Sequence, residues 1–213
     1  MIVVVDYGMG NLRSVSNALE TLGASVTVSG DPAELARAQK LILPGVGAFP
    51  AAMRELTMRG LVEPVKVAIA AGRPYLGICL GLQLLFDRSD EAGGAEGLSV
   101  LPGIVNRFQS MAAPGALKLR VPHMGWNQVT RGQRSKVRGQ ECPLLRDIPE
   151  GSFVYFVHSY YAQPDDRSIV ALETAYGVQF PAMVWRDNLY ATQFHPEKSQ
   201  AVGLQLLKNF VDL

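Results

Sequence analysis

One cysteine of the chain lies between two glycines, where an apolar strand-like run passes into an apolar helix-like run. Residues 73–86 read RPYLGICLGLQLLF, with Gly77 and Gly81 flanking Cys79 as G-x-C-x-G. This pattern is typical of a nucleophile elbow, a tight turn that holds a nucleophile clear of its neighbours. The amides and positive dipole end of the following helix favour the thiolate. By itself the pattern also fits a buried cysteine that acts as a small hydrophobic side chain.

A thiol nucleophile needs a base, and His195 is the candidate among the three histidines. It stands in ATQFHPEKS, after the last strand-like run, and Glu197 follows two positions later, beyond Pro196. We expect the carboxylate to turn back, fix the imidazole tautomer and complete a Cys79–His195–Glu197 triad. Alone, His195 would fit a helix-capping or solvent-facing histidine, but beside the elbow the catalytic role is favoured.

Two places can supply oxyanion donors for such a nucleophile. The amide of Leu80 follows Cys79 directly, at the start of the next helix. In LPGVGAF, Gly45 and Gly47 bracket Val46, and glycines allow backbone amides to turn toward a developing negative charge. The second pattern also fits an ordinary glycine loop.

The elements that must position these groups alternate between strands and helices over about the first ninety residues. This alternation predicts right-handed crossovers and a parallel sheet, and it includes a helix over 80–86 after Cys79. From residue 98 the β-rich runs resemble antiparallel ribbons, and they include 103–108, 152–163, 168–177, 182–188 and 189–194. The last segment predicts a helix with Val202, Leu206 and Phe210 on one stripe. We expect one α/β domain over 1–213, with a central, mostly parallel sheet flanked by helices and antiparallel ribbons in the C-terminal half.

Composition sets broad limits on the class of protein. Hydrophobic residues make up 48% and charged residues 18% of the 213 residues, and the formal net charge is +1. These values argue against a disordered chain and against a global field for nucleic acid or an anionic membrane. The start MIVVVDYG predicts a strand rather than a signal peptide, and no run reaches the roughly 20 apolar residues of a membrane span. Two cysteines make no disulfide framework, so a cytoplasmic location is expected.

Other signals in the sequence are interpreted without a catalytic or ligand-binding role. Gly8 and Gly10 follow the first strand, but Arg13 stands where a dinucleotide fingerprint needs its third glycine. His123 and His158 lack metal-ligand spacing, so no metal is expected, and His158 is interpreted as a hydrogen-bonded structural residue. The basic segment 118–138 is interpreted as a solvated loop edge, and Cys142 as incidental.

Six segments together carry a resemblance to a known family. They are DYGMGNLRSV (6–15), LPGVGAF (43–49), GICLGLQLLF (77–86), PHMGWN (122–127), YFVHSYY (155–161) and QFHPEKS (193–199). In this order they resemble the class I, triad-type glutamine amidotransferases. More closely, they are similar to the glutaminase subunits of imidazole glycerol phosphate synthases.

The resemblance implies hydrolysis of glutamine to glutamate through a glutamyl thioester on Cys79, without a cofactor. It places Gln83 at the substrate, and its spacing from Cys79 puts both on one helical face. It also places Glu91 at the substrate amino group and the backbone of Ser159 and Tyr160 along the pocket.

A partner follows from the same resemblance. Such subunits deliver ammonia to a (β/α)₈-barrel cyclase in a heterodimer of histidine biosynthesis, and no nucleic acid or membrane is implied. Asn11, Trp126, Tyr155 and Lys198 match positions at the interface or the ammonia exit.

Two further functions remain open at this point. One is a free-standing cysteine hydrolase of the same fold that cleaves a γ-glutamyl or peptide bond. The other is a non-catalytic binding subunit, although the presence of Cys79, His195 and Glu197 together argues against it.

Overall fold

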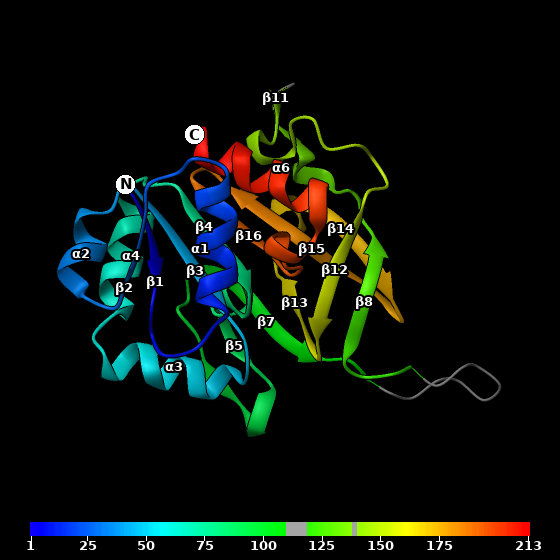
Figure 1. The fold of residues 1–213 in the computed structure, drawn as a ribbon. Coiled ribbons are helices and arrows are strands. Elements are labelled where there is room, and N and C mark those ends of the chain that lie inside the picture. Colours follow the sequence, from blue (N-terminus) through cyan, green and yellow to red (C-terminus); the bar gives the residue numbers. More distant parts are fainter. Residues whose placement is uncertain (110–118, 138–139) are drawn as a thin grey trace.

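The central element of the fold is an eight-stranded sheet in the order β2-β1-β3-β4-β16-β15-β14-β9 (Figure 1). The computed structural model describes residues 1–109, 119–137 and 140–213. Five strands are parallel: β1 Ile2–Val5, β2 Val26–Ser29, β3 Lys40–Gly45, β4 Tyr75–Cys79 and β16 Leu189–Thr192. Three continue the sheet antiparallel: β15 Val178–Arg186, β14 Val170–Tyr176 and β9 Thr130–Arg131. The expected central, mostly parallel sheet is confirmed.

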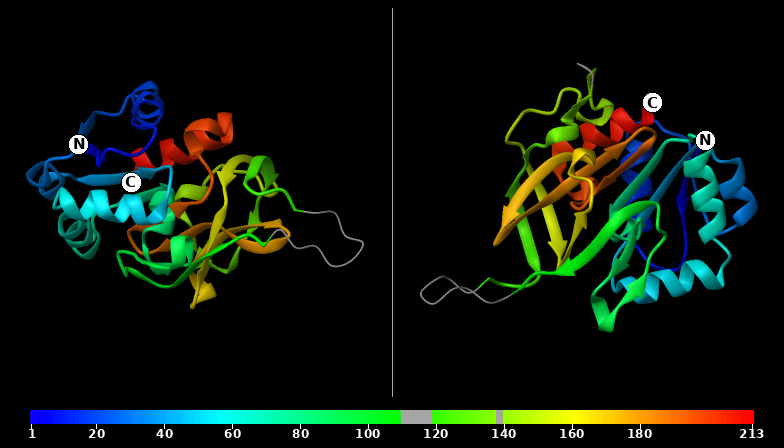
Figure 2. Two further views of the ribbon diagram at one scale, coloured as in Figure 1. Left: turned by 90° about the horizontal axis from the view of Figure 1, so that it is seen from below. Right: turned by 180° about the vertical axis from the view of Figure 1, so that it is seen from behind.

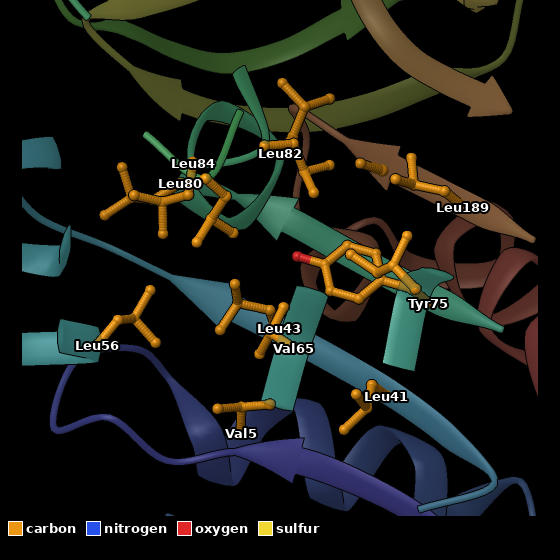
Figure 3. Close-up of a cluster of buried hydrophobic side chains, with 14 of the residues drawn as sticks. Val5, Leu41, Leu43, Leu56, Val65, Tyr75, Leu80, Leu82, Leu84 and Leu189 are labelled. Carbon is orange, nitrogen blue, oxygen red and sulfur yellow. The ribbon is translucent and has the colours of Figure 1, made fainter. Parts of the chain in front are cut away.

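Helices cover both faces of this sheet, because successive strand residues point to opposite sides. Val3 and Val5 face a core shared with α2 Pro32–Arg37, α3 Phe49–Met58 and α4 Val62–Ala70. Figure 3 shows part of this core, where Val65 of α4 lies beside Leu43 of β3. The alternate residues Ile2 and Val4 face a second core with α1 Leu12–Thr21 and α6 Gln200–Val211 (Figure 2). None of the helices in the described ranges has both the length and the apolar character needed to cross a membrane.

Side-chain caps fix the starts of two of these helices. The Asn11 side chain accepts a hydrogen bond from the Ser14 amide at 3.4 Å and so caps α1. Asp31 accepts one from the Ala33 amide at 2.8 Å, and Pro32 occupies the first turn of α2.

Smaller sheets accompany the central sheet. β8 His123–Gln128 pairs antiparallel with β12 Phe153–His158, and we call this pair the β8–β12 ribbon. A four-stranded sheet has the order β13-β7-β5-β6, and a third sheet joins β10 and β11. Their bounds are β5 Phe86–Ser89, β6 Ala95–Glu96, β7 Leu101–Arg107, β10 Lys136–Val137, β11 Gln140–Glu141 and β13 Tyr160–Pro164. Single 3-10 turns occur at η1 Glu91–Gly93, η2 Gln133–Ser135, η3 Pro143–Leu145, η4 Arg167–Ile169 and η5 Pro196–Lys198.

Two local expectations were wrong, and a third, the β-rich run 152–163, was right but incomplete. The helix after Cys79 is only α5 Leu80–Gln83, and the chain then enters β5, because an apolar run buried on all sides carries no period that separates helix from strand. The β-rich run 152–163 divides at Ser159 into β12 and β13, which belong to different sheets. The basic segment contains β8 rather than only a loop, and its two end residues lie outside the described part of the chain.

Close packing of α6 against η5 generates a stability prediction. A Cβ at Gly203 would lie 1.9 Å from the carbonyl oxygen of Pro196, a backbone atom. We expect Gly203→Ala to lower the free energy of unfolding by about 3 kcal/mol, since overpacking moves backbone. Gly23→Ala is the control: Gly23 has φ +80° with open space around it, and left-handed strain alone costs about 1 kcal/mol. Equal losses in urea unfolding of the two variants would contradict the crowding argument.

Candidate active site

Cys79 ends β4 in a backbone conformation that L-residues rarely adopt, with φ 55° and ψ −105°. The flanking positions must be glycine because backbone carbonyl oxygens approach them too closely for a Cβ atom. A Cβ at Gly81 would lie 1.8 Å from the Leu43 carbonyl oxygen, and one at Gly77 would lie 2.6 Å from the Gly81 carbonyl oxygen. Strained positions of this kind persist where the surrounding structure over-determines them, often at functional sites. The G-x-C-x-G pattern therefore has a packing cause.

The helix after the elbow is shorter than expected, and this changes the electrostatics of the thiol. With four residues, α5 contributes only a few aligned peptide dipoles. The thiol therefore depends more on individual neighbours. Cys79 Sγ lies 3.9 Å from the Val157 carbonyl oxygen and 3.7 Å from Nε2 of Gln193.

His195 reaches the elbow because β16 pairs parallel with β4. Thr192 is opposite Ile78, so the residues after β16 leave the sheet beside Cys79. The His195 amide donates to the Tyr155 carbonyl oxygen at 3.0 Å. Its Nδ1 lies 2.8 Å from Oε1 of Glu197 at η5, and both side chains are almost fully buried. The structure thus brings His195 and Glu197 into direct contact.

The protonation of His195 is set by opposing effects. Burial disfavours the imidazolium, but the neighbouring Cys79 and Glu197 outweigh it and raise the pKa of His195 to about 10. Nε2 of His195 has no hydrogen-bond partner in the described part of the chain. The ring is therefore held at Nδ1, while Nε2 remains available for proton transfer.

A cavity of about 310 Å³ opens over the elbow. Cys79 and all seven residues predicted as oxyanion donors or substrate contacts line it: Val46, Gly47, Leu80, Gln83, Glu91, Ser159 and Tyr160. Its volume lies at the small end of the range for ligand pockets, as suits one amino acid. Gly47 has φ +95° here, a conformation that favours glycine.

Two predicted substrate contacts are held in place by the protein itself. Oε2 of Glu91 accepts a hydrogen bond from the Phe49 amide at 2.8 Å, at the start of α3. Nε2 of Gln83 donates to the Tyr160 carbonyl oxygen at 2.9 Å and to Oε1 of Gln193 at 3.1 Å. Both carboxylate and amide are thus oriented before any ligand arrives.

Sequence reasoning missed four residues of this site. Val157, His158 and Pro122 line the cavity, and Gln193 lies beside the sulfur. A glutamine inside the apolar run before His195 was the one available signal, because a buried amide needs partners.

His158 is hydrogen-bonded, as expected, and forms a pair with His123. Nδ1 of His158 donates to the Tyr160 carbonyl oxygen at 2.7 Å, so its Nε2 accepts from Nδ1 of His123 at 3.0 Å. Nε2 of His123 then accepts from Asn127 at 3.3 Å. Both rings are neutral in this chain of bonds. Burial lowers the pKa of His123 to about 4 and that of His158 to about 3. No group of three or more acidic, histidine or cysteine residues in the described ranges is arranged to hold a metal.

Three of the four residues predicted at a partner interface lie together. The rings of Trp126 and Tyr155 are 6.1 Å apart between centroids, and Nζ of Lys198 lies 6.0 Å from the Tyr155 ring. Asn11 is different. Its side chain accepts a hydrogen bond from the Ser14 amide and so caps α1.

Two arginines of the basic segment and the second cysteine have local explanations. Half-buried Arg131 pairs with Glu141 and Glu150, and half-buried Arg134 pairs with Asp187. Cys142 is fully buried in the core, and burial raises its pKa to about 12.

The fold and the site define a class of protein. Residues 3–213 match the family described as glutamine amidotransferase class-I. The chain belongs to this family.

Two relatives that are about half identical to this chain share one specific name. A protein of Syntrophotalea carbinolica is 54% identical over 213 residues, covering all of both chains, and one of Geobacter sulfurreducens is 50% identical, covering 100% of this chain and 98% of its own. Both are named imidazole glycerol phosphate synthase subunit HisH.

Solved structures show the same fold. One titled glutamine amidotransferase has a TM-score of 0.72 at 18% identity and full coverage of both chains. The structure of PurLQS from Thermotoga maritima has a TM-score of 0.70 at 18% identity, covering 99% of this chain and 97% of its own. At this identity the likeness concerns the fold alone.

The histidines predict a stability maximum near pH 6.5. Between that value and their lowered pKa values, His123 and His158 bind protons only in the unfolded chain, so stability falls with acidity. Each contributes about 1.4 kcal/mol per pH unit. His195 has a raised pKa, so its contribution is lost as pH rises from about 6.5 to about 10. Urea unfolding from pH 4.5 to 9.5 measures the fall in stability on both the acid and the alkaline side of the maximum.

A variant tests whether the buried histidines cause the loss of stability at low pH. His123→Phe keeps a ring between Phe156 and Tyr176 but removes one titrating group. Below pH 6.5 its free energy of unfolding should fall less steeply with acidity than that of the wild type. The difference in slope should correspond to the uptake of about one proton fewer on unfolding. Identical slopes for variant and wild type would contradict the assignment.

Proposed function

We propose that this chain is the glutaminase subunit of an imidazole glycerol phosphate synthase, which hydrolyses glutamine and supplies ammonia to a cyclase in histidine biosynthesis. One observation carries the proposal: the Cys79 elbow and the His195–Glu197 pair meet at adjacent strand ends under a cavity of about 310 Å³. Full-length relatives at 54% and 50% identity, both named as HisH subunits, support the particular synthase.

The proposed reaction begins at the sulfur. In the resting site the proton of the Cys79 thiol is held on His195, whose pKa is raised to about 10, and the Cys79 thiolate attacks the side-chain carboxamide carbon of glutamine. The amide of Leu80, with the turn at Val46 and Gly47, stabilises the oxyanion. His195 returns the proton to the departing nitrogen, and ammonia leaves a glutamyl thioester. Water, deprotonated by His195, then releases glutamate, and the C–S electron pair returns to sulfur.

Substrate recognition follows from the groups already oriented in the cavity. The Glu91 carboxylate suits the α-ammonium group of glutamine. Both N–H groups of Gln83 are occupied, so this side chain presents its oxygen as an acceptor. The backbone of Ser159 and Tyr160 completes the wall.

The outward face of the β8–β12 ribbon supports a protein partner. Met124, Trp126 and Phe153 are 62%, 47% and 56% exposed, and strand pairing puts them on the same face as Tyr155 and Val157. Exposed apolar patches of this kind mark interaction sites. Val157 also lines the cavity, so the patch adjoins the place where ammonia forms.

We infer from this adjacency that a (β/α)₈ cyclase docks here as a heterodimer. Ammonia would pass beside Tyr155 and Lys198, and Asn11 would contribute at the rim. A cytoplasmic location, without nucleic acid, membrane or cofactor, belongs to the same proposal.

The catalytic prediction concerns glutamate release. The purified chain should hydrolyse glutamine slowly alone and much faster with the cyclase and its nucleotide substrate, because the glycine-flanked turn at Val46 must present an amide. Cys79→Ala should abolish activity, and Glu197→Gln should lower kcat by about 10²-fold or more through loss of imidazolium stabilisation. Cys142→Ala, which removes the other thiol, is the control. High activity that ignores the cyclase would indicate a free-standing hydrolase instead.

The interface prediction concerns affinity. Trp126→Ala should weaken cyclase binding by about 30-fold or more, as expected of a central aromatic hot spot, without changing the melting temperature of the isolated chain. Met58→Ala, at a site 66% exposed on α3, is the matched control. Isothermal titration calorimetry measures both, and equal affinities would remove the ribbon face from the proposed interface.

A further inference from the structure

Gln193 is a fully buried polar side chain immediately beyond β16. Because Thr192 is opposite Ile78 in the parallel pair, Gln193 leaves the sheet beside Cys79. Its Nε2 lies 3.7 Å from the Cys79 sulfur. It does not line the cavity over the elbow, so it contacts the nucleophile from the protein side.

The orientation of this amide is determined by its neighbours. Nε2 of Gln83 donates to Oε1 of Gln193, and the same Nε2 donates to the Tyr160 carbonyl oxygen. That carbonyl oxygen can only accept, so Gln83 cannot be reversed. Oε1 of Gln193 is therefore the acceptor toward Gln83, and its N–H groups must face the sulfur.

We infer that Gln193 is a further catalytic residue, whose amide N–H stabilises the Cys79 thiolate, with Gln83 as the positioning residue that orients it. This inference rests on the proposed function, since it assigns a role within the same reaction. A donor to the ionised form favours ionisation, and α5 is too short to do much of this by its dipole.

The donor acts twice in the reaction. While the Cys79 proton is held on His195, the sulfur carries a negative charge and the Gln193 bond is strong. When the S–C bond of the thioester forms, the charge leaves the sulfur and the bond weakens. When water breaks that bond, the electron pair returns to sulfur and the N–H accommodates it again.

Other titratable groups near the sulfur must be kept constant in any test. His195 and Tyr7 interact with Cys79 electrostatically, and Glu91, His158 and Tyr160 line the cavity. Substitution at Gln193 leaves all five unchanged. Gln193→Met keeps the length of the side chain without its donors and adds no titratable group, so it is the decisive variant. Gln193→Glu keeps the shape but replaces the N–H group by oxygen, and its added carboxylate also disfavours the thiolate.

The experiment measures iodoacetamide alkylation of Cys79 against pH, located by peptide mass spectrometry, together with glutamine kinetics in the cyclase complex. For both variants we expect the alkylation midpoint to move up by about one pH unit. We expect kcat to fall about tenfold with KM little changed, since Gln193 does not line the cavity. Gln179→Met, at an exposed glutamine of β15, is the control. An unmoved midpoint in a folded Gln193→Met overturns the inference.

The experiment distinguishes a failure of the proposed function from a failure of the role assigned to Gln193. A wild-type complex that releases no glutamate overturns the proposed function, whereas an active wild type with unmoved variants overturns the role of Gln193 alone. If both Gln193 variants fail to fold, the alkylation profile of Gln83→Met decides. That variant frees the Gln193 amide to turn, so the midpoint should again rise, and an unchanged midpoint overturns the inference.

Discussion

The parallel pairing of β16 with β4 is the constraint on which the site depends. These strands are far apart in sequence, yet their register puts Ile78 opposite Thr192 and so ends both at one edge of the sheet. Ligands in open α/β sheets bind at such carboxyl ends. The elbow at Cys79 and the turn at His195 are then neighbours without any long side chain having to reach across. Gly81, pressed against the Leu43 carbonyl oxygen, fixes the approach of the third strand as well.

Burial disfavours the charged form of all three histidines, but their pKa values move in opposite directions. His195 is paired with the Glu197 carboxylate, which outweighs desolvation and favours the charged ring. His123 and His158 are paired with each other and with neutral partners, so desolvation prevails. The same residue type thus serves as a proton carrier in one place and as a rigid hydrogen-bonding spacer in the other. The partner, not the degree of burial, decides between the two.

Much of this arrangement could be predicted from local patterns. Alternation of strands and helices indicated the parallel sheet, and the glycines around Cys79 indicated the elbow. The spacing of His195 and Glu197 is short enough for a local argument to hold. What could not be predicted depends on long-range pairing. The break at Ser159 arises because β12 and β13 join different sheets, and the environment of Gln193 exists only once β16 lies beside β4. The apolar run after Cys79 misled because helix and strand bury such residues equally.

The ribbon face with Met124, Trp126 and Phe153 also has a consequence for how the chain is made and kept folded. A partner that binds only the folded chain stabilises it by mass action, so the melting temperature depends on the concentration of that partner. Chains made in excess of such a partner would leave these apolar side chains exposed, which promotes self-association and degradation. If the proposed cyclase docks on this face, the face requires that the two chains be produced in matched amounts.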